Sequence, residues 1–200
     1  MILAGGLARR MGGGDKPLRL LAGKPILGHV IARLQPQVSA LAINANGDPG
    51  RLDAFGLPIV EDTMPEYQGP LAGTLAGLLW ARNACPGVTH LQTMPGDTPF
   101  LPSDLVARLD AARGRAGALI AQAESDGKLH PVVSLWPLEL TEPLEAALMA
   151  GMRRVREFQS HYSVAIEAFA FDGIDPFHNV NTPEDLAEAE RLATRFMAAG

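Results

Sequence analysis

The sequence has few of the features that mark secreted, membrane or nucleic-acid-binding proteins. Cys85 is the only cysteine in 200 residues, which excludes an internal disulfide and favours a reducing compartment. No apolar run approaches the ~20 residues that span a bilayer, and the first residues lack the charged segment and apolar core of an export signal. The net charge of −5 argues against broad affinity for nucleic acid. We therefore expect a cytoplasmic protein that binds neither membranes nor nucleic acid.

The composition is that of a folded globular chain. Hydrophobic residues make up 47% and charged residues 20% of the sequence, which argues against intrinsic disorder. At this length, roughly 70% of the surface of the unfolded chain is buried on folding, which is enough for a core without metal or disulfide support. No low-complexity linker or internal repeat interrupts the sequence. We predict one domain over residues 1–200.

Positive charge is concentrated at the start of the chain. Residues 1–33 hold six of the 17 lysines and arginines and one acidic residue, which gives this segment a charge of +5. Residues 34–200 carry a charge of −10. A basic end on an acidic body indicates either a local anion site or a solvated basic face, and charge alone does not choose between them.

Short apolar segments rich in Val and Ile alternate with longer segments of helical periodicity. This alternation, with strands that are apolar on both faces, predicts an α/β fold: a three-layer α/β/α Rossmann-like sandwich with a mostly parallel sheet. Ligands of such sheets bind outside the carboxyl ends of the strands. The predicted strands are 1–3, 38–44, 57–61, 88–94, 118–121, 132–135 and 164–171, and the predicted helices are 25–34, 71–84, 103–113, 144–150 and 183–198.

A glycine-rich loop over residues 3–16 follows the first predicted strand. It is neither a Walker loop nor a dinucleotide fingerprint, because Lys16 is followed by Pro17 and no G-x-G-x-x-G is present. Its glycines allow successive backbone N–H groups to converge on an anion. Arg10 and Lys16 supply cations that suit phosphate. The composition favours a phosphate-binding loop over a flexible basic surface loop, without excluding the latter.

Polar residues also follow the other predicted strands. Asn44 ends the second strand, Asp62 follows the third and Asp97 follows the fourth, so all three are expected at the ligand-binding edge of the sheet. Two of them have a structural alternative: a strand-end residue for Asp62, and a turn or helix cap for Asp97. Asn179 and Asn181 share one face if their segment is extended, although a turn before the last helix is the alternative.

The motif L-A-G-G-x-x-x-R-M-G-G-x-D-K at residues 3–16 resembles the opening of the molybdenum cofactor guanylyltransferases, part of a wider nucleotidyltransferase superfamily. The resemblance continues in order along nearly the whole chain. It implies the fold of the nucleotide-diphospho-sugar transferases. The further matching segments are 23–25, 43–46, 61–62, 69–73, 97–102, 130–131 and 179–186.

The resemblance implies a reaction and a set of site residues. GMP is transferred from GTP to the terminal phosphate of molybdenum-bound molybdopterin, with Mg²⁺ as cofactor and pyrophosphate as the second product. It implies Lys16, Arg10 and Asp97 as catalytic residues and Asp97 and Asn181 as metal ligands, with Asn179 as the alternative to Asn181. The implied nucleotide-binding residues are Leu3, Ala4, Gly5, Gly6, Gly12, Gly13, Lys16, Asn44, Asp62, Leu71 and Asp97.

Partners and alternatives follow from the same resemblance. GTP and molybdopterin are the small-molecule partners, and molybdoenzymes, their chaperones and the molybdenum insertion protein are candidate protein partners. His130 and the basic segment 153–156 are candidate contacts for the pterin phosphate or, equally, a core histidine and a solvated helix face. A cytidylyltransferase using CTP and a non-catalytic GTP-binding delivery protein remain the alternatives. The segments 3–6 and 69–73 favour guanine, and the presence of Lys16 and Asp97 disfavours the delivery protein.

Overall fold

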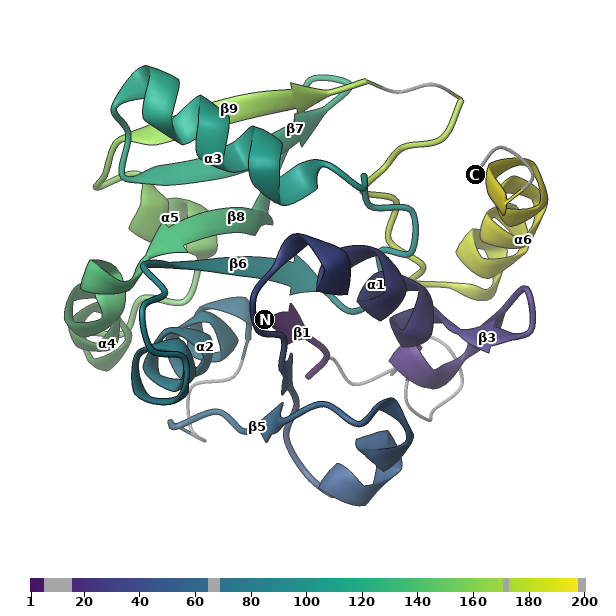
Figure 1. Ribbon diagram of the computed structural model, residues 1–200, viewed down its shortest axis with the longest axis horizontal. Coiled ribbons are helices and arrows are strands. Elements are labelled where there is room, and N and C mark those ends of the chain that lie inside the picture. Colours follow the sequence, from purple (N-terminus) through teal and green to yellow (C-terminus); the bar gives the residue numbers. More distant parts are fainter. Residues whose placement is uncertain (6–15, 65–68, 171–172, 198–200) are drawn as a thin grey trace.

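A mostly parallel sheet forms the middle of the protein. The structure is a computed structural model that describes residues 1–5, 16–64, 69–170 and 173–197. Within these residues, seven strands form one sheet in the order β5-β4-β1-β6-β8-β7-β9 (Figure 1). The strands are β1 (Ile2–Leu3), β4 (Ile43–Asn44), β5 (Ile59–Val60), β6 (His90–Pro95), β7 (Ile120–Ser125), β8 (Lys128–Pro137) and β9 (Val164–Phe169).

The strand directions confirm the predicted α/β class. β1 pairs in parallel with β4 and β6, β4 with β5, and β7 with β9. β8 runs antiparallel to both of its neighbours, β6 and β7. It reverses the chain through a two-residue turn at Asp126 and Gly127, whose φ angles of 49° and 72° fit a tight hairpin. Only residues 132–135 of this strand were predicted from the sequence, and the Asp-Gly turn signal was overlooked.

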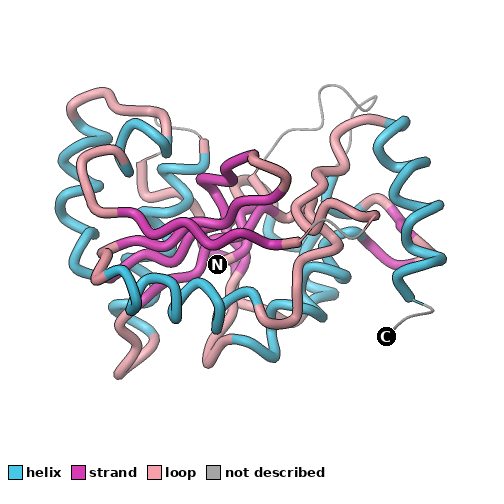
Figure 2. Tube along the Cα trace, turned by 90° about the horizontal axis from the view of Figure 1, so that it is seen from above, coloured by secondary structure: helices cyan, strands magenta, loops and turns pink. Residues whose placement is uncertain are grey.

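Helices cover both faces of the sheet, as the three-layer prediction requires. On one face α1 (Ile26–Leu34) and α3 (Leu105–Ala116) enclose a core with Ile2, Met94 and Val133. On the other face α2 (Pro70–Ala84), α4 (Thr141–Met149) and α5 (Val155–Gln159) enclose a core around Trp136. Figure 2 shows the strands in magenta with helices on both sides. No helix in the described part of the chain combines the length and apolarity needed to cross a membrane.

A third, smaller core lies beyond the carboxyl ends of the strands. There α6 (Pro183–Met197) packs against the hairpin of β2 (Leu20–Leu21) and β3 (Lys24–Pro25) (Figure 1). The N–H of Ala22 donates to the Glu190 carboxylate at 2.9 Å. Buried residues of this core include Leu21, Phe100 and Val180.

The start of α6 is capped by side chains of its own first turn. The Thr182 hydroxyl accepts a hydrogen bond from Asp185 N at 3.1 Å, and the Asp185 carboxylate accepts from the N–H of Thr182 at 2.9 Å. This reciprocal pair satisfies backbone donors that a helix N-terminus leaves without partners.

Several element boundaries differ from the prediction because pairing, not local pattern, sets them. Of the predicted strand 38–44 only Ile43–Asn44 is a strand, since β1 offers only Ile2 and Leu3 as partners. α3 and α4 each begin and end within a few residues of the predicted bounds. Elements without a clear periodicity were not predicted: β2, β3, α5 and the 3-10 helices Lys16–Leu18, Gln35–Gln37, Pro49–Phe55 and Leu138–Leu140.

Gly73 allows α2 to approach the carboxyl ends of β1 and β4. A Cβ atom at this position would overlap the side-chain oxygen of Asn44 and lie 3.0 Å from Leu3 Cδ2. Helix α2 therefore packs directly over the residues at which these two strands end, and only glycine permits this distance.

We predict that Gly73→Ala lowers the free energy of unfolding by about 2 kcal/mol, because a methyl group must be forced into a filled space. Urea unfolding of both proteins measures the difference. Gly114→Ala in α3 is the matched control: an added Cβ there meets nothing within 4 Å, so a gain of up to about 1 kcal/mol is expected from helix propensity. Equal effects of the two substitutions would contradict the close-packing argument.

Candidate functional site

The strand register brings the predicted polar residues to one edge of the sheet. Leu3 lies opposite Asn44 on one side and Pro95 on the other. Ala4 N donates to Asn44 O at 2.8 Å, and Gly96 N donates to Leu3 O at 2.9 Å. The glycine-rich segment therefore leaves β1 between the ends of β4 and β6, where Asn44 and Asp97 lie.

The Asp62 carboxylate is held between two asparagines. Asn44 Nδ2 donates to its Oδ1 at 2.9 Å and Asn46 Nδ2 donates to its Oδ2 at 2.8 Å. Asn46 Oδ1 in return accepts from Asp62 N at 2.9 Å. Asn44 is buried, with 4% of its surface exposed, whereas Asn46 is exposed and Asp62 is partly exposed. The carboxylate is thus fixed in orientation at a surface that a ligand can reach.

Asn46 was not among the predicted site residues. Its signal in the sequence is the N-x-N spacing at the end of β4. This spacing lies in the matching segment 43–46, in which only Asn44 was assigned a role. Only the contact with Asp62 identifies that role.

Asp97 lies just after β6 and is joined to a distant segment by Asn179. Asn179 Nδ2 donates to Asp97 Oδ1 at 2.7 Å and to Thr98 Oγ1 at 3.2 Å, and Val180 N donates to Asp97 O at 3.0 Å. Asn181 is exposed, and its amide Nδ2 lies 3.5 Å from Asn179 O. The structure thus brings Asn179, the alternative metal ligand of the sequence analysis, into contact with Asp97, and places Asn181 two residues further along.

The donors around Asp97 fit a hard divalent cation. A partly exposed carboxylate with neutral side-chain amides nearby suits Mg²⁺, which binds through one or two protein oxygens and keeps waters and substrate phosphates. Among the described residues there is no group of three His, Cys, Asp or Glu side chains that could enclose a metal. The residues present therefore fit an open magnesium site that substrate phosphates complete.

The start of α2 lies at the same edge. Gly69 has φ 124° and ψ −178°, a conformation that only glycine adopts readily, and Pro70 occupies the first turn. Leu71 as a whole is 1% exposed and belongs to the core, so its side chain packs inside the protein and is not presented at this edge.

Part of the predicted phosphate loop lies outside the described residues. This applies to Gly6, Arg10, Gly12 and Gly13. Leu3, Ala4 and Gly5 are described at the end of β1, and Lys16 begins the 3-10 helix Lys16–Leu18.

His130, a candidate contact for the pterin phosphate, is 8% exposed and makes a hydrogen bond of 2.7 Å between its Nε2 and the Ser125 hydroxyl. Burial lowers the pKa of His130, with Asp175 opposing this shift. Arg153, in the basic segment, donates to the backbone oxygens of Leu148 and Met152 at 3.0 and 2.8 Å.

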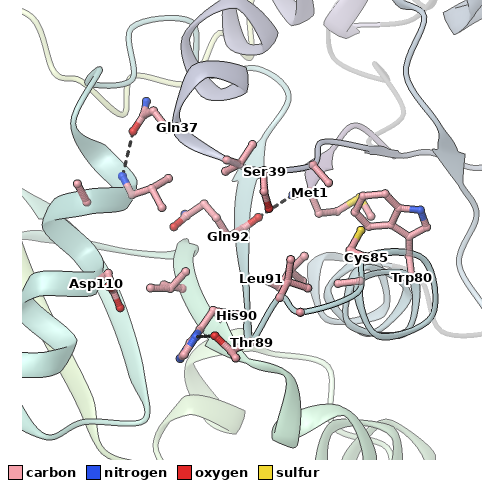
Figure 3. Close-up of a pocket in the computed structure, with 18 of the residues that line it drawn as sticks. Met1, Gln37, Ser39, Trp80, Cys85, Thr89, His90, Leu91, Gln92 and Asp110 are labelled. Atoms are coloured by element: carbon pink, nitrogen blue, oxygen red, sulfur yellow. Dashed lines mark hydrogen bonds between the residues drawn. The ribbon is translucent and has the colours of Figure 1, made fainter.

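A separate cavity lies at the end of β6 opposite to the candidate site. It has a volume of about 530 Å³ and is lined by the first residues of β6, the end of α2 and one side of α3 (Figure 3). His90 and Gln92 border it, whereas Asp97 follows the opposite end of the same strand. The cavity is therefore distinct from the edge at which the candidate site residues gather.

Comparison with known proteins gives a consistent result. The family model described as MobA-like NTP transferase domain matches residues 1–164. A molybdenum cofactor guanylyltransferase of Rhodopseudomonas palustris (strain BisB5) is 53% identical over 196 residues, which cover 98% of this chain and 93% of that protein.

Solved structures share the fold. Molybdopterin-guanine dinucleotide biosynthesis protein A from Archaeoglobus fulgidus superposes with a TM-score of 0.72 at 20% identity, covering 97% of each chain. A Mycobacterium tuberculosis H37Rv protein solved in complex with manganese superposes with a TM-score of 0.67 at 16% identity, covering 95% of this chain and 96% of that one. These structural matches establish the fold alone. The sequence matches go further: the chain belongs to the MobA-like NTP transferase family and is a nucleotidyltransferase related to the molybdenum cofactor guanylyltransferases.

Proposed function

We propose that this protein transfers GMP from GTP to the terminal phosphate of molybdenum-bound molybdopterin. An oxygen of the pterin phosphate forms a bond to the α-phosphorus of GTP, and the bond from that phosphorus to the bridging oxygen breaks as pyrophosphate leaves. The observation that carries the proposal is the placement of Asp97 and the Asp62–Asn44–Asn46 group at one edge of the sheet, on both sides of the end of β1. The 53% identical guanylyltransferase supports the choice of substrates.

The chemical problem of this reaction is crowded negative charge. The attacking phosphate is already largely ionised at neutral pH, so no nucleophilic side chain is needed. Positioning and electrostatic neutralisation then supply most of the rate enhancement. In our proposal the backbone from Leu3 to Gly6, with that of Gly12 and Gly13, lines the nucleotide and its phosphates, and Arg10 and Lys16 offset their charge.

Asp97 would hold Mg²⁺, with Asn181 as a second protein ligand. When bound, Mg²⁺ supplies positive charge next to the phosphate oxygens and the departing pyrophosphate. Asn179, which already donates to Asp97 Oδ1, keeps the carboxylate in a fixed orientation. A manganese complex of a structural neighbour supports a divalent cation at this fold.

In our proposal Asp62 selects the base. Guanine presents donors at N1 and N2, for which a carboxylate is a suitable acceptor, whereas cytosine and adenine present a different pattern. The two asparagines hold the carboxylate before the nucleotide arrives, so binding does not have to order it.

The same proposal includes three further points. The chain forms one domain over residues 1–200, it acts in the cytoplasm, and its product is delivered to molybdoenzymes or their chaperones.

We expect the enzyme to prefer GTP over CTP and ATP by about 100-fold in kcat/KM, since base donors unmatched by the site are costly to desolvate. Pyrophosphate release with Mg²⁺, measured with and without molybdopterin, gives the ratio. A preference for CTP would identify a cytidylyltransferase instead. Binding of GTP with no molybdopterin-dependent pyrophosphate release would identify a delivery protein.

Asp97→Asn is expected to lower kcat about 100-fold, because an amide offers a divalent cation no charge and developing phosphate charge is then poorly neutralised. Asp104→Asn is the matched control. It also replaces an aspartate by asparagine between β6 and α3, but at an exposed residue next to Arg108. Its rate should stay within about twofold of the native enzyme, and both variants should keep the native circular dichroism spectrum. A rate for Asp97→Asn within threefold of native would refute the assigned role.

A further inference from the structure

The two asparagines near the metal site lie on a segment without helix or strand. After β9 the chain crosses the carboxyl edge of the sheet towards α6 (Figure 1), and residues 173–182 form only turns and extended backbone. Irregular segments lack the ladder hydrogen bonds that fix a strand, so side chains must hold them in place. At its far end, Asp185 accepts hydrogen bonds from the N–H groups of Asn181 and Thr182, at 2.8 and 2.9 Å.

The near end of this segment is held by Asp175. Its Oδ1 accepts from the Phe177 N–H at 2.9 Å, and its backbone oxygen accepts from the His178 N–H at 3.0 Å, which together form a tight turn. The same Oδ1 accepts from the Ser125 hydroxyl at 2.8 Å. Ser125 is the last residue of β7 and is 1% exposed, so the turn is tied to the rigid part of the sheet.

The hydroxyl of Ser125 links two groups at once. A hydroxyl has one proton, and the carboxylate of Asp175 can only accept, so that proton points to Asp175. The contact of 2.7 Å with His130 Nε2 is then a hydrogen bond that the ring donates to Ser125 Oγ. The geometry therefore assigns the proton of His130 to Nε2, and a chain of two hydrogen bonds runs from β8 through the end of β7 to the turn.

Aromatic packing holds Phe177, within the turn that Asp175 forms. The Phe177 ring lies 4.7 Å from the His130 ring and 5.3 Å, edge to face, from the Phe169 ring. Phe177 is 1% exposed. Two residues further on, Asn179 reaches Asp97, and Val180 N donates to Asp97 O. The position of Asn179 over β6 thus depends on how the turn at Asp175 is held over β7 and β8.

We propose that Ser125 is a positioning residue which, through Asp175, sets the orientation of Asn179 and of the Asp97 carboxylate. His130 holds the Ser125 hydroxyl in the direction that Asp175 needs. This inference rests on the proposed function, because it assigns the network to the metal side of that site. The Asp62–Asn44–Asn46 group lies at the ends of β4 and β5, on the other side of the strand order, and has no hydrogen bond to Ser125 within the described residues. We therefore expect the network to affect the rate more than the affinity for GTP.

Ser125→Ala tests this with Ser134→Ala as its matched control. Ser134 is also a fully buried serine of the same sheet, with hydrogen bonds to Pro131 O and from Gln159 Nε2. In the described part of the chain it makes no hydrogen bond to the 173–182 segment. We expect Ser125→Ala to lower kcat about tenfold with KM for GTP within twofold. Ser134→Ala should leave both constants close to native.

Amide hydrogen exchange of the ligand-free protein gives a second readout that needs no catalysis. The N–H groups of Phe177 and Val180 should exchange about tenfold faster in Ser125→Ala and at the native rate in Ser134→Ala. Asp175→Ala should reproduce both effects of Ser125→Ala, and Asp175→Asn, which keeps the accepting oxygen, should restore most of the native rate. If Ser125→Ala does not fold, the comparison of Asp175→Ala with Asp175→Asn tests the same proposal.

The outcomes separate the two proposals. Unchanged exchange in Ser125→Ala and Asp175→Ala, or faster exchange with an unchanged kcat, overturns the positioning role. Equal effects of Ser125→Ala and Ser134→Ala overturn it as well, since they indicate general destabilisation. A native protein that transfers no guanylyl group refutes the proposed function, and in that case the exchange rates alone decide whether Ser125 holds the segment.

Discussion

The parallel register of β4, β1 and β6 is the constraint on which the rest of the site depends. With Leu3 opposite both Asn44 and Pro95, three strands end at the same level. The chain after each strand therefore emerges at the same edge of the sheet, which is where ligands of parallel α/β sheets bind. A shift of β1 by one residue would exchange the buried Ile2 with Leu3 and turn the side chains of the strand to the opposite faces. The register thus determines both the core and the site.

The polar groups at this edge are ordered by one another before any ligand is present. Asp62 lies between two asparagine amides and Asp97 accepts from a third, so each carboxylate has a fixed orientation. A reaction between two phosphate esters gains most from charges and dipoles that need no reorganisation in the transition state. Neutral amides serve this purpose well, because they orient a carboxylate without cancelling the negative charge that a divalent cation requires.

The sequence allowed the α/β class, the mostly parallel sheet and the residues at the strand ends to be predicted, because those follow from local patterns. Apolar segments end at Asn44 and before Asp62 and Asp97, and the Thr182 cap can be read directly from T-P-E-D. The reversed direction of β8 was not predicted, although Asp126-Gly127 is a hairpin signal. The contact between Asn179 and Asp97 joins residues 82 positions apart. No local pattern specifies such a contact, since it arises from the way the last segment crosses the sheet.

The two sides of the sheet, β4 and β5 on one and β7 to β9 on the other, hold the site residues in different ways. On the β4 and β5 side, the polar residues are on the strand ends themselves and are fixed by the ladder and by Gly73, which admits α2 against Asn44. On the β7 to β9 side, Asn179 and Asn181 are on an irregular segment, and its position is set by two carboxylates, Asp175 and Asp185, that accept backbone hydrogen bonds. A segment held at two points can adjust between them more easily than a strand end can. The orientation of Asn179 and Asp97 therefore depends on these few side-chain hydrogen bonds, whereas that of Asn44 and Asp62 depends on the sheet itself.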